Sequence, residues 1–206
     1  PFDEDSVDFL DPLMDFYKIA SADLTNYPLL KKISSKNKPI ILSLGASTFD
    51  EINAALKFLK KNNADNLILL HCILNYPTID QNANLDKINL LKEKYKNHII
   101  GYSDHTLPDS LMLPLVMATL YGSKIIEKHF TYDKKLKGND HYHAMDHQDL
   151  KNLRLILKKL SILNGNKNYD PLKLEKKARK NARRSLVLKE DIKKGDIIKS
   201  KHLISK

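Results

Sequence analysis

Two histidines stand at corresponding places near the ends of two apolar segments, where strands of a sheet are expected. Side chains alternate along a strand, so Ser103 and His105 share one side of the first segment, and Glu127 and His129 share one side of the next. Two imidazoles on neighbouring strands, with positions left open for substrate or water, suit a divalent Lewis acid such as Mn²⁺, Mg²⁺ or Co²⁺. Hydrogen-bonded structural histidines are the alternative.

A lysine inside an apolar segment is the second candidate for chemistry. Lys18 lies among apolar neighbours, and burying an ammonium group is costly unless an anion compensates. A substrate phosphate or carboxylate would serve, together with the hydroxyl groups of Ser21, Ser43 and Ser103. An ion pair with Glu127 would serve as well, and the sequence leaves both possibilities open.

The segment HYHAMDH at residues 141–147 is rich in histidine. It could form a second metal site, or a loop that covers the substrate before the next helix. We favour the loop, with Asp146 as the N-cap residue of that helix.

Strand and helix patterns alternate along most of the chain, and their order must position these residues. Strands are expected at Tyr17 to Ser21, Pro39 to Gly45, Asn66 to Cys72, Ile99 to His105 and Lys124 to Phe130. Helices are expected between them, with a capping box at Thr48 and Glu51, and further ones at Leu85 to Tyr95, Ser110 to Leu120 and Gln148 to Leu163. In the helix after Thr48, the apolar stripe is Phe49, Ile52, Leu56 and Leu59.

The positions of the polar residues distinguish a (β/α)8 TIM barrel from an open doubly wound sheet. Polar residues follow all five expected strands: Ser21, Asp23, Ser43, His71, Asn75, Tyr76, Ser103, Asp104, His105 and His129. In a barrel all strand ends form one active face, whereas an open sheet gathers its ligand at one switch point. The pattern favours the barrel, and because five units do not close one, we expect N-terminal units that precede Pro1.

The pattern changes at NGNKNYDP, a run of turn residues near Asn164. We predict a barrel domain over residues 1–164, a linker over 165–182 and the start of a small β-rich domain over 183–206. Two β-prone runs around Lys194 and Gly195 support the last of these.

The composition narrows the class of protein. The 206 residues are 42% hydrophobic and 29% charged, as in a globular protein, and no run reaches the ~20 apolar residues of a membrane span. The net charge of +10 comes from lysines spread over helix faces without aromatic partners, so we expect no nucleic-acid partner. The acidic N-terminal segment and the single Cys72, interpreted as a buried apolar residue, fit a cytoplasmic location.

Six motifs resemble the sialic acid synthases, a family that includes the legionaminic and pseudaminic acid synthases. They are KIASADLTNYPLL, KPIILSLGAST, LLHCILNYPT, GYSDHT, IEKHFT and GNDHYHAMD, in the order of that family. The resemblance implies a barrel that condenses phosphoenolpyruvate with N-acetylmannosamine or a related amino sugar, and releases phosphate. It implies that residues from Arg183 begin an antifreeze-like (SAF) domain, which lies over a partner's barrel in a domain-exchanged homodimer.

The same resemblance assigns roles to individual residues. Lys18, Ser21, Ser43 and Ser103 would bind phosphoenolpyruvate; His105 and His129 would bind Mn²⁺; Asn75, Tyr76 and Asp140 would contact the acceptor sugar; and Asp23 would be catalytic. Asp23 stands where the family often has Glu. Leu74 replaces a polar residue, and the sequence SLGA replaces the family's usual serine or threonine followed by glycine. The preference for the acceptor sugar could therefore differ. Further family residues, a glutamate and a lysine from upstream strands and a partner's arginine, are outside these motifs.

Overall fold

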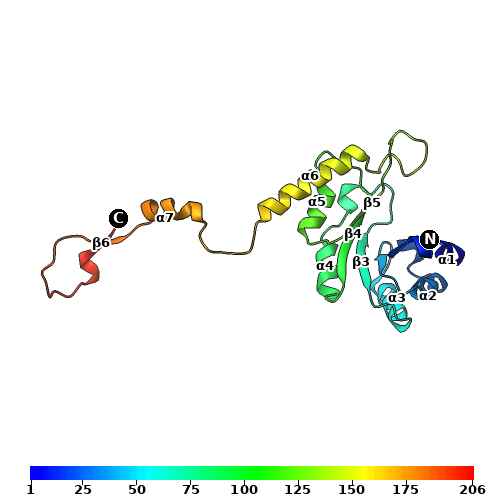
Figure 1. The fold of residues 1–206 in the computed structure, drawn as a ribbon, viewed down its shortest axis with the longest axis horizontal. Helices are drawn as coiled ribbons and strands as arrows, with labels where there is room; N and C mark the ends of the chain where they lie inside the picture. Colours follow the sequence, from blue (N-terminus) through cyan, green and yellow to red (C-terminus); the bar gives the residue numbers. More distant parts are fainter. The chain divides into compact units, whose positions relative to one another are not determined.

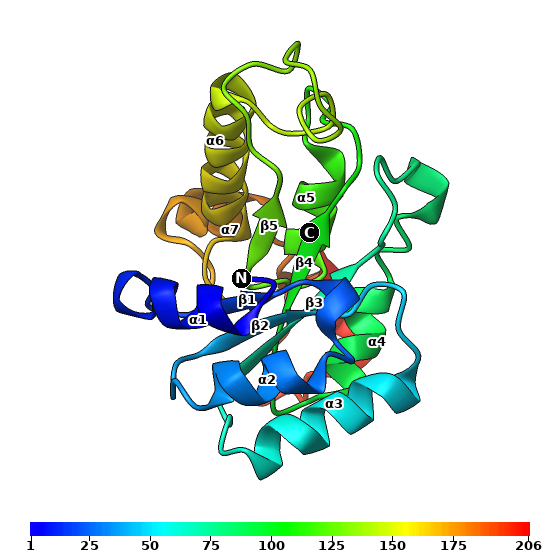
Figure 2. The same ribbon diagram turned by 90° about the vertical axis from the view of Figure 1, so that its right-hand side faces the viewer.

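The computed structural model describes residues 1–206, which form two units, Pro1–Leu163 and Asn164–Lys206. The first unit (Figure 1) contains a parallel sheet of five strands in the order β1-β2-β3-β4-β5, as predicted; Figure 2 labels all five. Its strands are β1 (Tyr17–Ile19), β2 (Ile40–Ser43), β3 (Leu67–Cys72), β4 (Ile99–Asp104) and β5 (Ile126–Lys128). Consecutive strands are neighbours and all run in the same direction, so their carboxyl ends lie at the same edge of the sheet.

One helix precedes the first strand, the others follow the strands in turn, and together they lie along the curve of the sheet (Figure 2). They are α1 (Glu4–Leu10), α2 (Tyr27–Ser34), α3 (Phe49–Lys61), α4 (Lys87–Lys94), α5 (Leu113–Leu120) and α6 (His147–Asn164). The predicted capping box is confirmed, because Thr48 Oγ1 accepts from Glu51 N and Glu51 Oε2 accepts from Thr48 N. The predicted stripe is wrong at Phe49, which is 38% exposed; Ala55 is buried in its place.

One apolar core joins the sheet to its helices. Leu42 and Leu69 of the central strands, and Leu30 and Ile33 of α2, are completely buried in it. Replacing such a leucine by alanine costs about 2–5 kcal/mol. The core therefore holds the strand ends, where the polar residues lie, in a fixed arrangement.

The expected strands are longer than the observed ones, most clearly in the last. Lys124 to Phe130 was expected, and only Ile126–Lys128 is a strand. Phe130 instead forms an isolated parallel bridge with Met145, because the chain returns alongside it before α6. This return brings a distant loop to the end of β5.

The second unit, described by itself, has α7 (Lys176–Ala182) and an antiparallel pair of short strands, β6 (Leu186–Leu188) and β7 (Leu203–Ser205). The two strands lie on either side of the turn at Gly195, as the two β-prone runs predict. In the whole structure, no helix combines the length and the apolar character that a membrane crossing needs.

Candidate functional site

A cavity of about 540 Å³ opens at the carboxyl ends of the strands. Eight of the ten predicted site residues line it: Lys18, Ser21, Ser43, Tyr76, Ser103, His105, His129 and Asp140. Cys72, Glu127 and Lys128 also line it. The β4–β5 register places Ser103 opposite Glu127, as the alternation of side chains requires.

Two predicted site residues lie outside this cavity lining. The Asp23 carboxylate accepts a hydrogen bond from Asn26 Nδ2 at 3.1 Å, next to the start of α2. Asn75 is exposed, and its carbonyl accepts from Thr78 Oγ1 at 2.8 Å. The side chains of Asp23 and Asn75 therefore do not line the cavity with the other eight residues.

Lys18 faces Glu127, as one of the two interpretations of the sequence expects. Lys18 Nζ lies 3.3 Å from Glu127 Oε2, and both side chains are partly exposed. Ser103 Oγ donates to the other carboxylate oxygen of Glu127 at 2.6 Å. Glu127 thus occupies two groups that could hold an anion. The sequence had suggested it only as an ion-pair partner.

The other two hydroxyl groups are differently engaged. Ser21 Oγ accepts from the backbone N–H of Gly45 at 2.9 Å, so its own hydrogen remains available. A Cβ on residue 45 would lie 2.8 Å from that oxygen, which explains glycine here. Ser43 Oγ is buried and has no hydrogen-bond partner. An unpaired buried hydroxyl that lines a cavity is suited to a ligand.

The two strand-end histidines lie side by side, with ring centroids 5.3 Å apart. His105 Nδ1 donates to the Ile73 carbonyl at 2.8 Å, which leaves Nε2 unprotonated and free to bind a metal. Burial lowers the pKa of His105, which favours this neutral form. The ring of Tyr76 packs 4.1 Å from that of His105 and 5.7 Å from that of His129.

A buried ion pair lies directly beneath the histidines. Asp104 and Lys128, one residue before His105 and His129, are each 2% exposed and 2.7 Å apart. Asp104 also accepts from Tyr102 Oη and from the N–H and hydroxyl of Thr106, and Lys128 Nζ donates to the Thr106 carbonyl. Our sequence analysis did not predict this pair, although an acid and a base directly before the two histidines could have indicated it.

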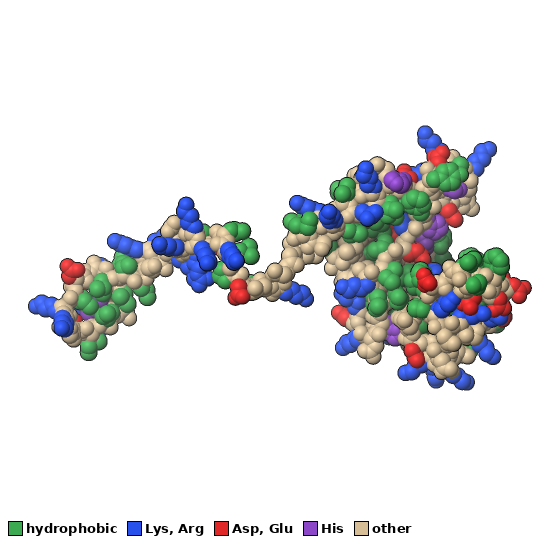
Figure 3. Space-filling view, viewed as in Figure 1, with side chains coloured by type: hydrophobic (Ala, Val, Ile, Leu, Met, Phe, Trp, Pro, Cys, Tyr) green, Lys and Arg blue, Asp and Glu red, His purple; other side chains and the backbone are tan.

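A third histidine, on the loop before α6, was not among the predicted site residues. His129, Asp140 and His143 could each offer an atom to one ion, all within 4.8 Å of one another. The same loop does provide the predicted cap, since Asp146 Oδ1 accepts from Asp149 N at 2.9 Å. Figure 3 shows histidine side chains gathered beside this loop, whereas Lys and Arg are scattered over the visible face.

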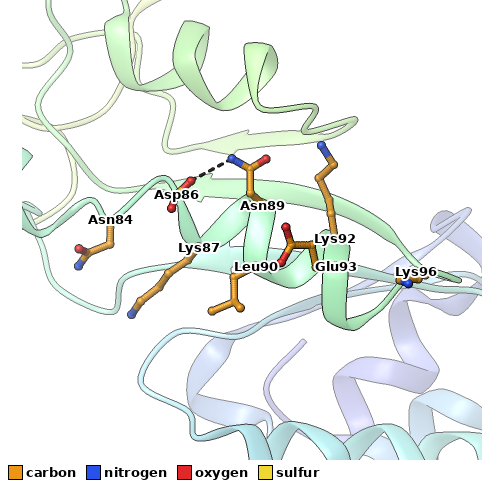
Figure 4. Close-up of a pocket in the computed structure, with 8 residues that line it drawn as sticks. All are labelled: Asn84, Asp86, Lys87, Asn89, Leu90, Lys92, Glu93 and Lys96. Carbon is orange, nitrogen blue, oxygen red and sulfur yellow. Dashed lines mark hydrogen bonds between the residues drawn. The ribbon is translucent and has the colours of Figure 1, made fainter.

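A larger hollow of about 750 Å³ runs along α4, away from the strand ends (Figure 4). Mixed charges and amides line it, among them Lys87, Glu93 and the hydrogen-bonded pair Asn89 and Asp86. Most of these side chains are exposed and point to solvent. The hollow brings no buried polar group to a common point, so we place the functional site at the strand ends.

A parallel α/β sheet with a polar, histidine-bearing cavity at its strand ends is an arrangement typical of TIM-barrel enzymes. The chain matches the NeuB family over residues 1–169, and it belongs to that family.

Three relatives illustrate the likeness. An uncharacterized protein of Methanocaldococcus jannaschii is 43% identical over 96% of this chain and 58% of its own length. The N,N'-diacetyllegionaminic acid synthase of Campylobacter jejuni is 41% identical over 100% of this chain and 61% of its own. The crystal structure of N-acetylneuraminic acid (sialic acid) synthetase from Leptospira borgpetersenii has a TM-score of 0.76 and 32% identity, covering 88% of this chain and 63% of that one. The chain thus spans about three fifths of the length of these proteins.

Proposed function

We propose that the complete gene product is a cytoplasmic, metal-dependent synthase that condenses phosphoenolpyruvate with an N-acetylated amino sugar, N-acetylmannosamine or a relative of it. The products are a nonulosonic acid such as sialic acid, and phosphate. One observation carries the proposal: a single cavity gathers a lysine, three serine hydroxyls and two imidazoles from four strand ends. Family membership supports the same chemistry.

The donor site of this proposal consists of Lys18 with Ser21, Ser43 and Ser103. The ammonium group would offset the charge of phosphoenolpyruvate, and the free hydroxyl of Ser43 would hydrogen-bond to it. Because Glu127 already contacts Lys18 and Ser103, the incoming anion has to compete with that carboxylate. We therefore expect Glu127 to turn away when the donor binds.

His105 and His129 are the proposed ligands of Mn²⁺, or of Mg²⁺ or Co²⁺ in its place. Their fit rests on the free Nε2 of His105 and on the closeness of the two rings. The bound ion would supply Lewis acidity for the acceptor carbonyl. The acceptor sugar would be oriented by Tyr76, Asp140 and Asn75. Asp23, which lies outside the cavity lining, is proposed as an acid or base of the reaction.

In the reaction, the enol carbon of phosphoenolpyruvate attacks the aldehyde carbon of the sugar, and a C–C bond forms. The cationic centre left at C2 takes up water, and phosphate departs with cleavage of its C–O bond. Lys18 and the three serines hold the donor in line with the acceptor throughout. Positioning of this kind provides a large part of the rate enhancement of such a bimolecular step.

A diacetamido sugar is the second candidate acceptor. It is favoured by the 41% identity to a protein named N,N'-diacetyllegionaminic acid synthase. Phosphoenolpyruvate contains no nitrogen, so both acetamido groups of such a product must come from the sugar. Pseudaminic acid synthesis is the corresponding alternative for a stereoisomeric acceptor within the same family.

The test supplies the complete gene product with phosphoenolpyruvate and each sugar in turn, and measures phosphate release and product mass. Release with N-acetylmannosamine supports sialic acid synthesis, and release only with a diacetamido sugar supports the second candidate. Lys18→Met keeps most of the side-chain volume and should abolish saturation by phosphoenolpyruvate. Consumption of no sugar at all, with the fold intact, would contradict the proposal.

We also propose how the two units take part in the complete gene product. Residues 1–164 would form the C-terminal part of a (β/α)8 barrel, residues 165–182 a linker, and residues 183–206 the beginning of an antifreeze-like (SAF) domain. That domain would lie over the barrel of a partner in a domain-exchanged homodimer. Mass in solution tests the dimer, and a monomer with full activity would contradict it.

A further inference from the structure

The loop before α6 is fixed against the end of β5 by its backbone. Met145 N donates to the His129 carbonyl at 2.8 Å, and Thr131 N donates to the Met145 carbonyl, also at 2.8 Å. The Thr131 hydroxyl is in turn hydrogen-bonded to His141 Nδ1 at 2.8 Å. These contacts hold the loop beside His129 without help from any ligand.

His143, carried by this loop, is completely buried and lacks hydrogen bonds at both ring nitrogens. Its Nε2 lies 3.5 Å from Asp140 Oδ1 without the alignment of a hydrogen bond. An unsatisfied buried polar group costs about 1–3 kcal/mol. If this position belonged only to the core, an apolar residue would be more stable there. A buried imidazole with two unpaired nitrogen atoms therefore indicates a bound ligand, such as a metal ion, that is coordinated by nitrogen.

The ring of His143 packs against that of His129, with centroids 5.0 Å apart. His129 Nδ1 lies 3.8 Å from Asp140 Oδ2. Two ligands bound at right angles, each about 2.1 Å from one ion, are about 3 Å apart. The two distances to Asp140, 3.5 Å from His143 and 3.8 Å from His129, exceed that spacing by less than about 1 Å. Asp140, whose side chain is 65% exposed, is free to close this gap.

We propose that His129, Asp140 and His143 together hold the divalent cation of the synthase. This inference rests on the proposed function, and it extends the strand-end pair by two ligands from the loop. With His105 they provide three imidazoles and one carboxylate, a ligand set that binds divalent transition metals and leaves positions open for substrate oxygen atoms. In this arrangement Asp140 is a ligand of the metal and does not serve only to contact the acceptor sugar.

The test titrates Mn²⁺ alone into the complete gene product and follows free Mn²⁺ by electron paramagnetic resonance. His143→Ala, His143→Gln and Asp140→Asn should each raise the Kd at least about tenfold, which is the effect of losing even an outer-shell metal contact. His147→Ala is the matched control, because it removes an exposed histidine at the start of α6 that is outside the ligand set. Its Kd should stay within about twofold of the wild type.

Unchanged Mn²⁺ affinity in both folded His143 variants would overturn the inference. If they lose their fold, pulsed electron paramagnetic resonance of the Mn²⁺-loaded wild type, labelled with ¹⁵N-histidine, decides: coupling to only two histidine nitrogens overturns the inference. Failure of the two proposals is distinguishable. If Mn²⁺ affinity falls in His105→Ala and His129→Ala but not in the His143 variants, the proposed function still holds and only this inference fails. If Mn²⁺ affinity falls in none of these variants, the cation site of the proposed function is also wrong.

Discussion

Replacing Lys128 by methionine should destabilise the protein strongly, because it strands a buried carboxylate. The Nζ of Lys128 lies 2.7 Å from Asp104 Oδ2, and both side chains are 2% exposed. At an effective dielectric constant of about 20, that attraction is about 6 kcal/mol.

We expect a loss of about 3–5 kcal/mol in the free energy of unfolding, the range for a broken buried pair. The loss stays below the full attraction because Asp104 keeps its hydrogen bonds from Tyr102 and Thr106. Urea denaturation of the complete gene product at pH 7 measures it. Asp104→Asn in the Lys128→Met background removes the stranded charge and should recover most of the loss.

The matched control is Lys18→Met, which breaks the partly exposed pair with Glu127. It should cost less than about 1 kcal/mol. A loss below about 1 kcal/mol in Lys128→Met, or a double variant no more stable than the single one, would refute the charge-based reasoning, because the effect would then come from packing.

Three further predictions concern a histidine, a helix cap and the second unit. Burial lowers the pKa of His71, so the folded protein resists a proton that the unfolded chain takes up near pH 6.5. The contribution of His71 to the free energy of unfolding should therefore be fully present above pH 6.5. As the pH drops below 6.5, the free energy of unfolding should decrease by up to about 1.4 kcal/mol per pH unit. The decrease should be less steep in His71→Gln, and equal slopes in the two proteins would contradict this. Thr48→Ala removes the α3 cap and should lower unfolding free energy by about 1 kcal/mol in urea titrations, whereas Ser47→Ala should not. Deleting residues after Asn164 should reduce turnover much more than Mn²⁺ affinity; full activity as a monomer would argue against a shared site.

Side-chain alternation explains why much of the cavity could be predicted from sequence. Ser103 with His105, and Glu127 with His129, follow the period of two that every strand imposes. The order of strands and the gathering of polar ends follow from the repeated strand and helix pattern. These features depend on local periodicity, and local periodicity is present in the sequence.

The remaining features depend on contacts between distant segments. His143 reaches His129 only because Met145 pairs with Phe130, and no local pattern announces that bridge. Asp23 was assigned by resemblance, but its carboxylate is engaged by Asn26. The choice between an anion and Glu127 as the partner of Lys18 likewise required the register of β4 and β5.

The close approach at Gly45 has a consequence for the evolution of this site. A methyl group there would come within 2.8 Å of Ser21 Oγ and 3.2 Å of Cys72 Sγ. A side chain at this position therefore requires that residue 21 changes or moves at the same time. Gly45 and Ser21 follow two different strands, so among descendants of this gene we expect a side chain at position 45 only together with a change at position 21.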